Sequence, residues 1–130
     1  MSKQAVTALI PARAGSKRYP RQNFVDLCGK PLVSWTIEAA LRSRVFTRIV
    51  LSSDALEARH IADKYGIYFH DRSLELSTDN ASIMDLFRSM VDTNILVDPL
   101  TMILQPTSPL RTECHIRDAY SPVSSTHLTL

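Results

Sequence analysis

Glycine is scarce in this 130-residue chain, which contains only 3 of them. The sequence has no GxGxxG dinucleotide fingerprint, and Gly29-Lys30 lacks the upstream glycine and the following Ser or Thr of a Walker A loop. Apolar runs are short, so no membrane-spanning segment and no membrane partner are expected. The 2 cysteines, Cys28 and Cys114, are not spaced as metal ligands, which predicts free thiols in a reducing compartment.

The chain also lacks a strong excess of charge of either sign, because its formal net charge is only +2. A nucleic-acid partner is therefore not expected for the chain as a whole. Hydrophobic residues make up 45% and charged residues 22%, which is the balance of a single globular domain. The apolar run near the N-terminus is short and is interpreted as a strand rather than a signal peptide. The expected location is the cytoplasm, or the nucleus in an animal cell.

Short apolar runs alternate with amphipathic segments along the chain. The runs predict strands at Ala5–Ile10, Arg48–Ser52, Ile67–Phe69 and Leu100–Leu104. Helical spacing of apolar residues predicts helices beginning at Pro31, after Asp54 and near Ile83. Strands that are apolar almost throughout favour a mainly parallel sheet with helices on both faces, a three-layer α/β/α architecture.

Two helix boundaries have specific signals. Asp54, with Glu57 three residues later, forms a capping-box pattern and predicts the start of the second helix at Asp54. Gly66 predicts its end, because glycine readily adopts the left-handed conformation that closes a helix. Trp35 lies in the apolar stripe of the first helix and is interpreted as a core residue.

Two unusual loops directly follow predicted strands, over residues 11–23 and 105–111. The carboxyl ends of parallel strands share one edge of a sheet, where ligands bind. Residues 13–30 contain five cations and one anion, and small residues stand between the first cations. Small residues let backbone N–H groups approach an anion, so the first loop suits a polyphosphate. A plain solvated basic loop is the alternative interpretation.

Several separated motifs then occur in a fixed order: "IPARAGSKRYPRQN", "LCGKPLVSWTIEAAL", "RIVLSSD", "DRSLELSTDNAS" and "LQPTSPLR". Together they resemble the cytidylyltransferases that activate nonulosonic acids, most of all the N-acylneuraminate type. The resemblance extends from about residue 6 to about residue 119. It implies a Rossmann-like nucleotidyltransferase fold, with residues 1–119 forming a CTP-binding half-domain and residues 120–130 a polar, poorly ordered tail.

The resemblance also implies a reaction and its partners. The anomeric hydroxyl of the sugar would attack the α-phosphorus of CTP, and pyrophosphate would leave. CTP and a nonulosonic acid are the implied substrates, Mg²⁺ is the implied cofactor, and the family forms homo-oligomers. This chain ends before the family's second half, which supplies the metal-binding aspartates and much of the dimer interface. No metal ligand is therefore assigned. The chain is interpreted as a first half, either a fragment or a truncated product, with little or no activity alone.

By resemblance, the first loop would hold the nucleotide. Arg13, Ser16 and Lys17 would hold the triphosphate, with Arg13 and Lys17 acting in catalysis. Asn23 and Ser82 would also contact the nucleotide. These assignments agree with the chemistry, because phosphoryl transfer needs cations and N–H groups placed where negative charge develops.

Arg72 and Gln105 would contact the substrate sugar by the same resemblance. Taken singly, Arg72 is typical of a surface cation, Ser82 of a helix cap and Gln105 of a strand end. Only their occurrence together, in family order, favours the functional interpretation.

One departure from the family pattern lies within the first loop. Gln22 occupies the position before Asn23 where the family has a lysine, and glutamine supplies hydrogen bonds without charge. The apolar Ile83 also follows Ser82 where a second serine is common. Two alternatives stay open, a non-catalytic nucleotide-binding module and a cytidylyltransferase for 3-deoxy-manno-octulosonate.

Overall fold

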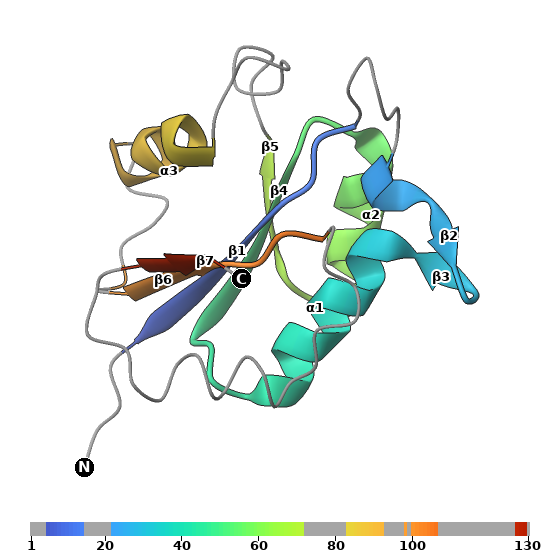
Figure 1. Ribbon diagram of the computed structural model, residues 1–130, viewed down its shortest axis with the longest axis horizontal. Helices are drawn as coiled ribbons and strands as arrows, with labels where there is room; N and C mark the ends of the chain where they lie inside the picture. Colours follow the sequence, from blue (N-terminus) through green and yellow to red (C-terminus); the bar gives the residue numbers. More distant parts are fainter. Residues whose placement is uncertain are drawn as a thin grey trace.

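The computed structural model describes residues 5–14, 22–71, 83–92, 98, 100–106 and 127–129. The main strands are β1 (Val6–Pro11), β4 (Arg48–Ser53), β5 (Tyr68–Asp71), β6 (Leu100–Ile103) and β7 (His127–Thr129). The helices are α1 (Leu32–Ser43), α2 (Leu56–Tyr65) and α3 (Ile83–Asp92). The 3₁₀ turn η1 (Gln22–Phe24) and a hairpin of β2 (Asp26–Leu27) and β3 (Lys30–Pro31) lie between β1 and α1 (Figure 1).

The five strands form one parallel sheet, and a mainly parallel sheet was predicted from the sequence. Their order is β5-β4-β1-β6-β7. β1 is central: Leu9 is in register with Val50 of β4 on one side and with Ile103 of β6 on the other. All six residues of β1 are buried. Both faces of this strand are therefore covered, which explains why its sequence is apolar rather than alternating.

The chain order places the helices on opposite faces of the sheet. From β1 the chain moves through α1 to β4 and through α2 to β5, and it then returns through α3 to β6 on the other side of β1. Crossovers between parallel strands are right-handed, so reversing the direction of travel moves the helix to the other face. Figure 1 shows α1 and α2 on one side and α3 on the other, which confirms three layers.

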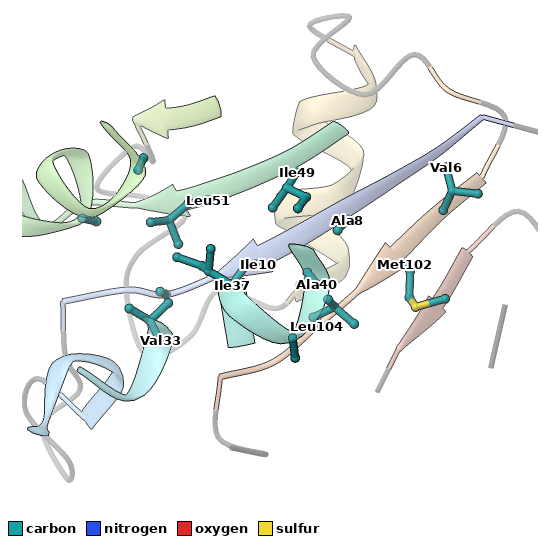
Figure 2. Close-up of a cluster of buried hydrophobic side chains, with 14 of the residues drawn as sticks. Val6, Ala8, Ile10, Val33, Ile37, Ala40, Ile49, Leu51, Met102 and Leu104 are labelled. Carbon is teal, nitrogen blue, oxygen red and sulfur yellow. The ribbon is translucent and has the colours of Figure 1, made fainter. Parts of the chain in front are cut away.

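Each face of the sheet has its own hydrophobic core. The larger core joins the sheet to α1 and α2, and Figure 2 shows Ile10, Ile37 and Leu51 gathered at its centre. The smaller core lies under α3 and consists of Leu9, Val50, Leu86, Met90 and Ile103. Neighbouring residues of β1 thus serve different cores, because successive side chains of a strand point to opposite faces.

The helix ends differ in part from the predictions. Pro31 precedes α1 as its N-cap, with φ −57° and ψ 145°, instead of being the first helical residue. α2 begins one residue later than predicted, with Ala55 as its N-cap, and the Ala55 N–H donates to Ser53 Oγ at 3.0 Å. Asp54 is therefore not the cap. The predicted end of α2 is confirmed, because Gly66 adopts φ 69°.

Residues 127–129 are the largest difference from the predicted secondary structure. A poorly ordered tail was expected over residues 120–130, whereas His127–Thr129 forms β7 and pairs in parallel with β6. Thr129 is β-branched and favours extended structure, and without β7 the edge of β6 would have unpaired backbone groups. Residues 120–126 and 130 lie outside the described part of the chain.

The hairpin turn contains an unfavourable residue. Cys28 and Gly29 are the two residues between β2 and β3, and both have positive φ, 50° and 95°. A two-residue turn of this kind favours Asn-Gly, since asparagine tolerates the left-handed region better than cysteine.

We therefore expect Cys28→Asn to stabilise the protein by about 0.5 kcal/mol, since asparagine is less strained at this φ. The midpoint of urea unfolding, at unchanged slope, measures this gain. Cys28→Val is the matched control and should be destabilising, because β-branched residues are poorly tolerated at positive φ. Equal midpoints for all three proteins would contradict the prediction.

Candidate functional site

The order of the strands creates a topological switch point at one edge of the sheet. The chain leaves β1 toward β4 on one side and arrives at β6 on the other side, so β1 and β6 flank a topological switch point. Ligands of open α/β sheets bind beyond the carboxyl ends of the strands at such a point. Arg13 follows β1 by two residues and Gln105 follows β6 by two residues, and both are half-buried. The structure thus brings two of the predicted site residues to the same edge of the sheet, at the switch point.

The first residues of the predicted phosphate loop are held in place by three hydrogen bonds. The Ala12 N–H donates to the Ser52 carbonyl at 2.8 Å, which extends the pairing of β1 with β4. The Ala14 N–H donates to Asp54 Oδ1 at 2.7 Å. The Asn23 Nδ2 amide donates to the Arg13 carbonyl at 3.1 Å and so closes the base of the loop.

These contacts give two residues roles that differ from the predicted ones. Asn23 was predicted to contact the nucleotide, and the structure shows its amide holding the loop backbone beside Arg13. Asp54 was predicted to cap a helix, and its carboxylate instead binds the loop from 40 residues away in sequence. The sequence signal for this role was an acidic residue directly after a buried strand, next to the edge where the loop was expected.

The other predicted site residues lie partly or wholly outside the described part of the chain. Ser16 and Lys17 belong to the loop between residues 14 and 22, and their roles stay predictions. Arg72 directly follows Asp71, the last residue of β5, and Ser82 directly precedes Ile83, the first residue of α3. Gln22 begins η1, one residue before Asn23, so the residue in the family's lysine position is adjacent to the closed base of the loop.

A polar pair lies on the face of the sheet that α3 covers. Ser52 of β4 is in register with His70 of β5, and the Ser52 Oγ lies 2.8 Å from His70 Nδ1. Ser52 is fully buried, so this hydrogen bond satisfies a hydroxyl that has no access to water. His70 therefore has a structural partner near the carboxyl end of the sheet.

A shallow hollow of about 170 Å³ opens beside β4 and β5, next to the start of α2. It is lined by Asp54, Ala55, Leu56, Arg59, Phe69 and Asp71. This volume of about 170 Å³ is well below the roughly 300–1,000 Å³ of typical small-molecule pockets. The hollow also lies on the β4–β5 side rather than at the switch point. The predicted nucleotide site is at the switch point between β1 and β6, and this hollow is not part of it.

Glu38 of α1 fastens the hairpin and α2 to the helix that follows the loop. Its carboxylate accepts hydrogen bonds from Lys30 Nζ at 2.7 and 2.9 Å and from the Tyr65 hydroxyl at 2.6 Å. The Lys30 and Tyr65 bonds lower the pKa of Glu38, and burial together with the Glu38 bond raises the pKa of Tyr65. Lys30 Nζ also lies 4.2 Å from the Trp35 ring centroid. Trp35 is only half-buried and lies against the hairpin. The prediction that it is a core residue is therefore wrong.

Comparison with known proteins decides the family. A family model described as "Cytidylyltransferase" matches residues 7–124, which is most of the chain. This chain belongs to the cytidylyltransferase family. The match includes nearly all of β1, the loop that follows it, and β6.

Curated relatives of this cytidylyltransferase chain share about two residues in five with it. N-acylneuraminate cytidylyltransferase of Escherichia coli O18:K1:H7 is 40% identical over 115 residues, covering 88% of this chain and 27% of the relative. Pseudaminic acid cytidylyltransferase of Campylobacter jejuni is 38% identical and is covered over 50% of its length. CMP-N,N'-diacetyllegionaminic acid synthase of Legionella pneumophila is 40% identical and is covered over 51%. The chain thus spans between a quarter and a half of these relatives.

Solved structures confirm the nucleotidyltransferase fold. The structure of CMP:2-keto-3-deoxy-manno-octonic acid synthetase complexed with CTP matches with a TM-score of 0.69 at 20% identity, over 88% of this chain and 45% of the other. A cytidylyltransferase from Leptospira borgpetersenii matches with a TM-score of 0.67 at 19% identity, over 92% of this chain and 51% of the other. At these identities the similarity concerns the fold alone.

No magnesium ligand is assigned among the described residues of this cytidylyltransferase chain. Within the described ranges, no three His, Cys, Asp or Glu side chains are grouped to bind a metal. Asp54, which lies beside the loop, already accepts the Ala14 N–H through Oδ1. No step of the reaction is therefore derived through a metal held by these residues. The helices of the described ranges are also too short or too polar to cross a membrane.

Proposed function

We propose that this chain forms the CTP-binding part of a cytidylyltransferase that transfers CMP to a nonulosonic acid and releases pyrophosphate. One observation carries the proposal: the family match includes the loop after β1, and the structure places the base of that loop at the switch point of a parallel sheet. A phosphate-binding loop at this place agrees with how open α/β sheets bind nucleotides.

The sugar class follows from the relatives. Three relatives at 38–40% identity are named for N-acylneuraminate, pseudaminic acid and N,N'-diacetyllegionaminic acid, all of which are nonulosonic acids. The match to the 2-keto-3-deoxy-manno-octonic acid synthetase rests on 20% identity and supports only the fold. The proposal is therefore made for nonulosonic acids as a class, with Gln105 beside the sugar.

Arg13 has the central part in this proposal. Arg13 lies just beyond the carboxyl end of β1, and its carbonyl accepts a hydrogen bond from Asn23. The backbone from which the Arg13 side chain extends is therefore held in place. A guanidinium offers several donors in a planar fork that matches phosphate oxygens. Placed beside the triphosphate, it would stabilise the charge that develops on the leaving pyrophosphate. Ser16, Lys17 and Ser82 would add contacts to the nucleotide, and Arg72 would contact the sugar.

We expect Arg13→Ala to weaken CTP binding at least tenfold, because a hydrogen bond to a charged group is worth about 1.5–3 kcal/mol. Isothermal titration calorimetry with CTP measures the change. Arg42→Ala is the matched control: Arg42 lies in the last turn of α1, and this exchange removes the same charge at the opposite edge of the sheet. Equal affinities for the unmodified chain and Arg13→Ala would overturn the loop assignment.

A further inference from the structure

We infer that Asp54 is a positioning residue of the nucleotide site, which sets the direction in which the phosphate loop leaves the sheet. The inference rests on the proposed function, because it concerns the same loop. Asp54 itself lies on the turn between β4 and α2 and does not belong to the loop. Its carboxylate acts on the loop through one hydrogen bond, from the Ala14 N–H to Oδ1 at 2.7 Å.

The position of Asp54 continues the pairing of two strands. The Ala12 N–H donates to the Ser52 carbonyl, and the next rung of the parallel ladder would join residues 14 and 54. At this point the chain turns toward α2, so the side chain of Asp54 accepts the Ala14 N–H. The carboxylate thus adds one rung to the sheet and carries the strand geometry of β1 two residues into the loop.

The same peptide group is held from its other side. The carbonyl of Arg13 and the N–H of Ala14 belong to one planar peptide unit. Asn23 Nδ2 donates to the Arg13 carbonyl at 3.1 Å, and Asp54 Oδ1 accepts from the Ala14 N–H at 2.7 Å. Two side chains from different segments therefore clamp this peptide, and with both bonds made it cannot rotate.

This clamp matters because the peptide joins the site's arginine to the rest of the loop. Fixing the backbone of one residue costs about 1–2 kcal/mol of conformational entropy. Here the backbone is fixed when the protein folds, so the cost does not reduce the free energy of CTP binding. The loop base is then already placed when CTP arrives. The carboxylate repels the triphosphate at long range, so its hydrogen bond and its charge have opposite effects on CTP affinity.

A capping role for Asp54 does not explain its position. α2 has Ala55 as its N-cap, and Ser53 Oγ accepts the Ala55 N–H. Asp54 is exposed, so little apolar packing depends on it. Its replacement should therefore change the loop much more than the stability of the fold.

Two replacements of Asp54 separate the hydrogen bond from the charge. Asp54→Ala removes both, and we expect CTP binding to weaken about tenfold. Asp54→Asn keeps an acceptor oxygen and removes the charge, so CTP affinity should equal or exceed that of the unmodified chain. Asp63→Ala removes a carboxylate from the far end of α2 and is the matched control. If Asp54→Ala and Asp54→Asn both tighten binding, Asp54 is only a repelling charge and the inference is wrong.

A double-mutant cycle tests the shared peptide. Asn23 and Asp54 bind the carbonyl and the N–H of the same peptide unit, so the loss of either hydrogen bond should allow this peptide to rotate. We expect Asn23→Ala with Asp54→Ala to weaken CTP binding about tenfold, as each single change does, and not about a hundredfold. Additive losses would show that the two residues act independently and would overturn the clamp.

Hydrogen exchange at the Ala14 amide, measured without nucleotide, distinguishes this inference from the proposed function. The amide should be protected in the unmodified chain and in Asp54→Asn, and it should exchange at least tenfold faster in Asp54→Ala. Unchanged exchange in Asp54→Ala would overturn the clamp even if CTP binds. A protected Ala14 amide in a chain that does not bind CTP would contradict the proposed function, and with it the positioning role.

Discussion

Replacing Leu9 by alanine is expected to destabilise the protein by about 3–5 kcal/mol, the range for fully buried leucines whose removal leaves a cavity. Leu9 is 0% exposed and stands at the middle of the central strand. It packs in the smaller core with Val50 and Ile103 from the neighbouring strands and with Leu86 from α3. The sheet on one side and the helix on the other limit how far the cavity can collapse, so the loss should lie high in its range.

Urea unfolding followed by circular dichroism measures the loss as a lower midpoint at unchanged slope. Leu56→Ala is the matched control, because Leu56 is 74% exposed at the start of α2 and should change the free energy of unfolding by less than about 0.5 kcal/mol. Equal losses for the two leucines would contradict the two-core description of the sheet.

The sequence predicted the layered sheet because its signals are local. The buried strands are runs of apolar residues, and Val6–Pro11 and Arg48–Ser53 lie within one residue of their predicted bounds. The end of α2 was predicted at Gly66 from a preference of one residue. The parallel arrangement then placed Arg13 and Gln105 at the same edge without further information.

The contacts that shape the loop could not be predicted in the same way. The bond between Ala14 and Asp54 joins residues 40 apart, and it depends on the register of β1 against β4. A capping box is a local pattern, and at Asp54 the tertiary contact prevailed over it. β7 was missed for a related reason, because its stability comes from the edge of β6 and not from its own short segment.

The residue before Asn23 offers the most direct change of chemistry in the site. Gln22 is the first residue of η1, and Asn23 is bonded to the Arg13 carbonyl, so position 22 lies at the closed base of the predicted phosphate loop. By resemblance, a lysine belongs there. A lysine would add a positive charge and three N–H donors beside the triphosphate, where glutamine offers an uncharged amide.

We expect Gln22→Lys to raise the rate of pyrophosphate release at least about 10²-fold, since one positioned group that stabilises developing charge is worth about that much. The assay contains CTP, Mg²⁺ and N-acetylneuraminate, and calorimetry of CTP binding accompanies it. We expect Gln22→Lys also to tighten CTP binding. This gain in affinity should become smaller as the salt concentration rises, because added ions screen the new charge.

The matched control is Gln4→Lys, which makes the same exchange two residues before the first residue of β1 in the sequence. It adds the same net charge, so any gain from general attraction of CTP should appear in both variants. A gain confined to Gln22→Lys would show that position 22 acts locally on the phosphates. Equal rates for Gln22→Lys and the unmodified chain would contradict this. In that case the charge at position 22 does not limit the reaction, and the non-catalytic nucleotide-binding alternative would be favoured.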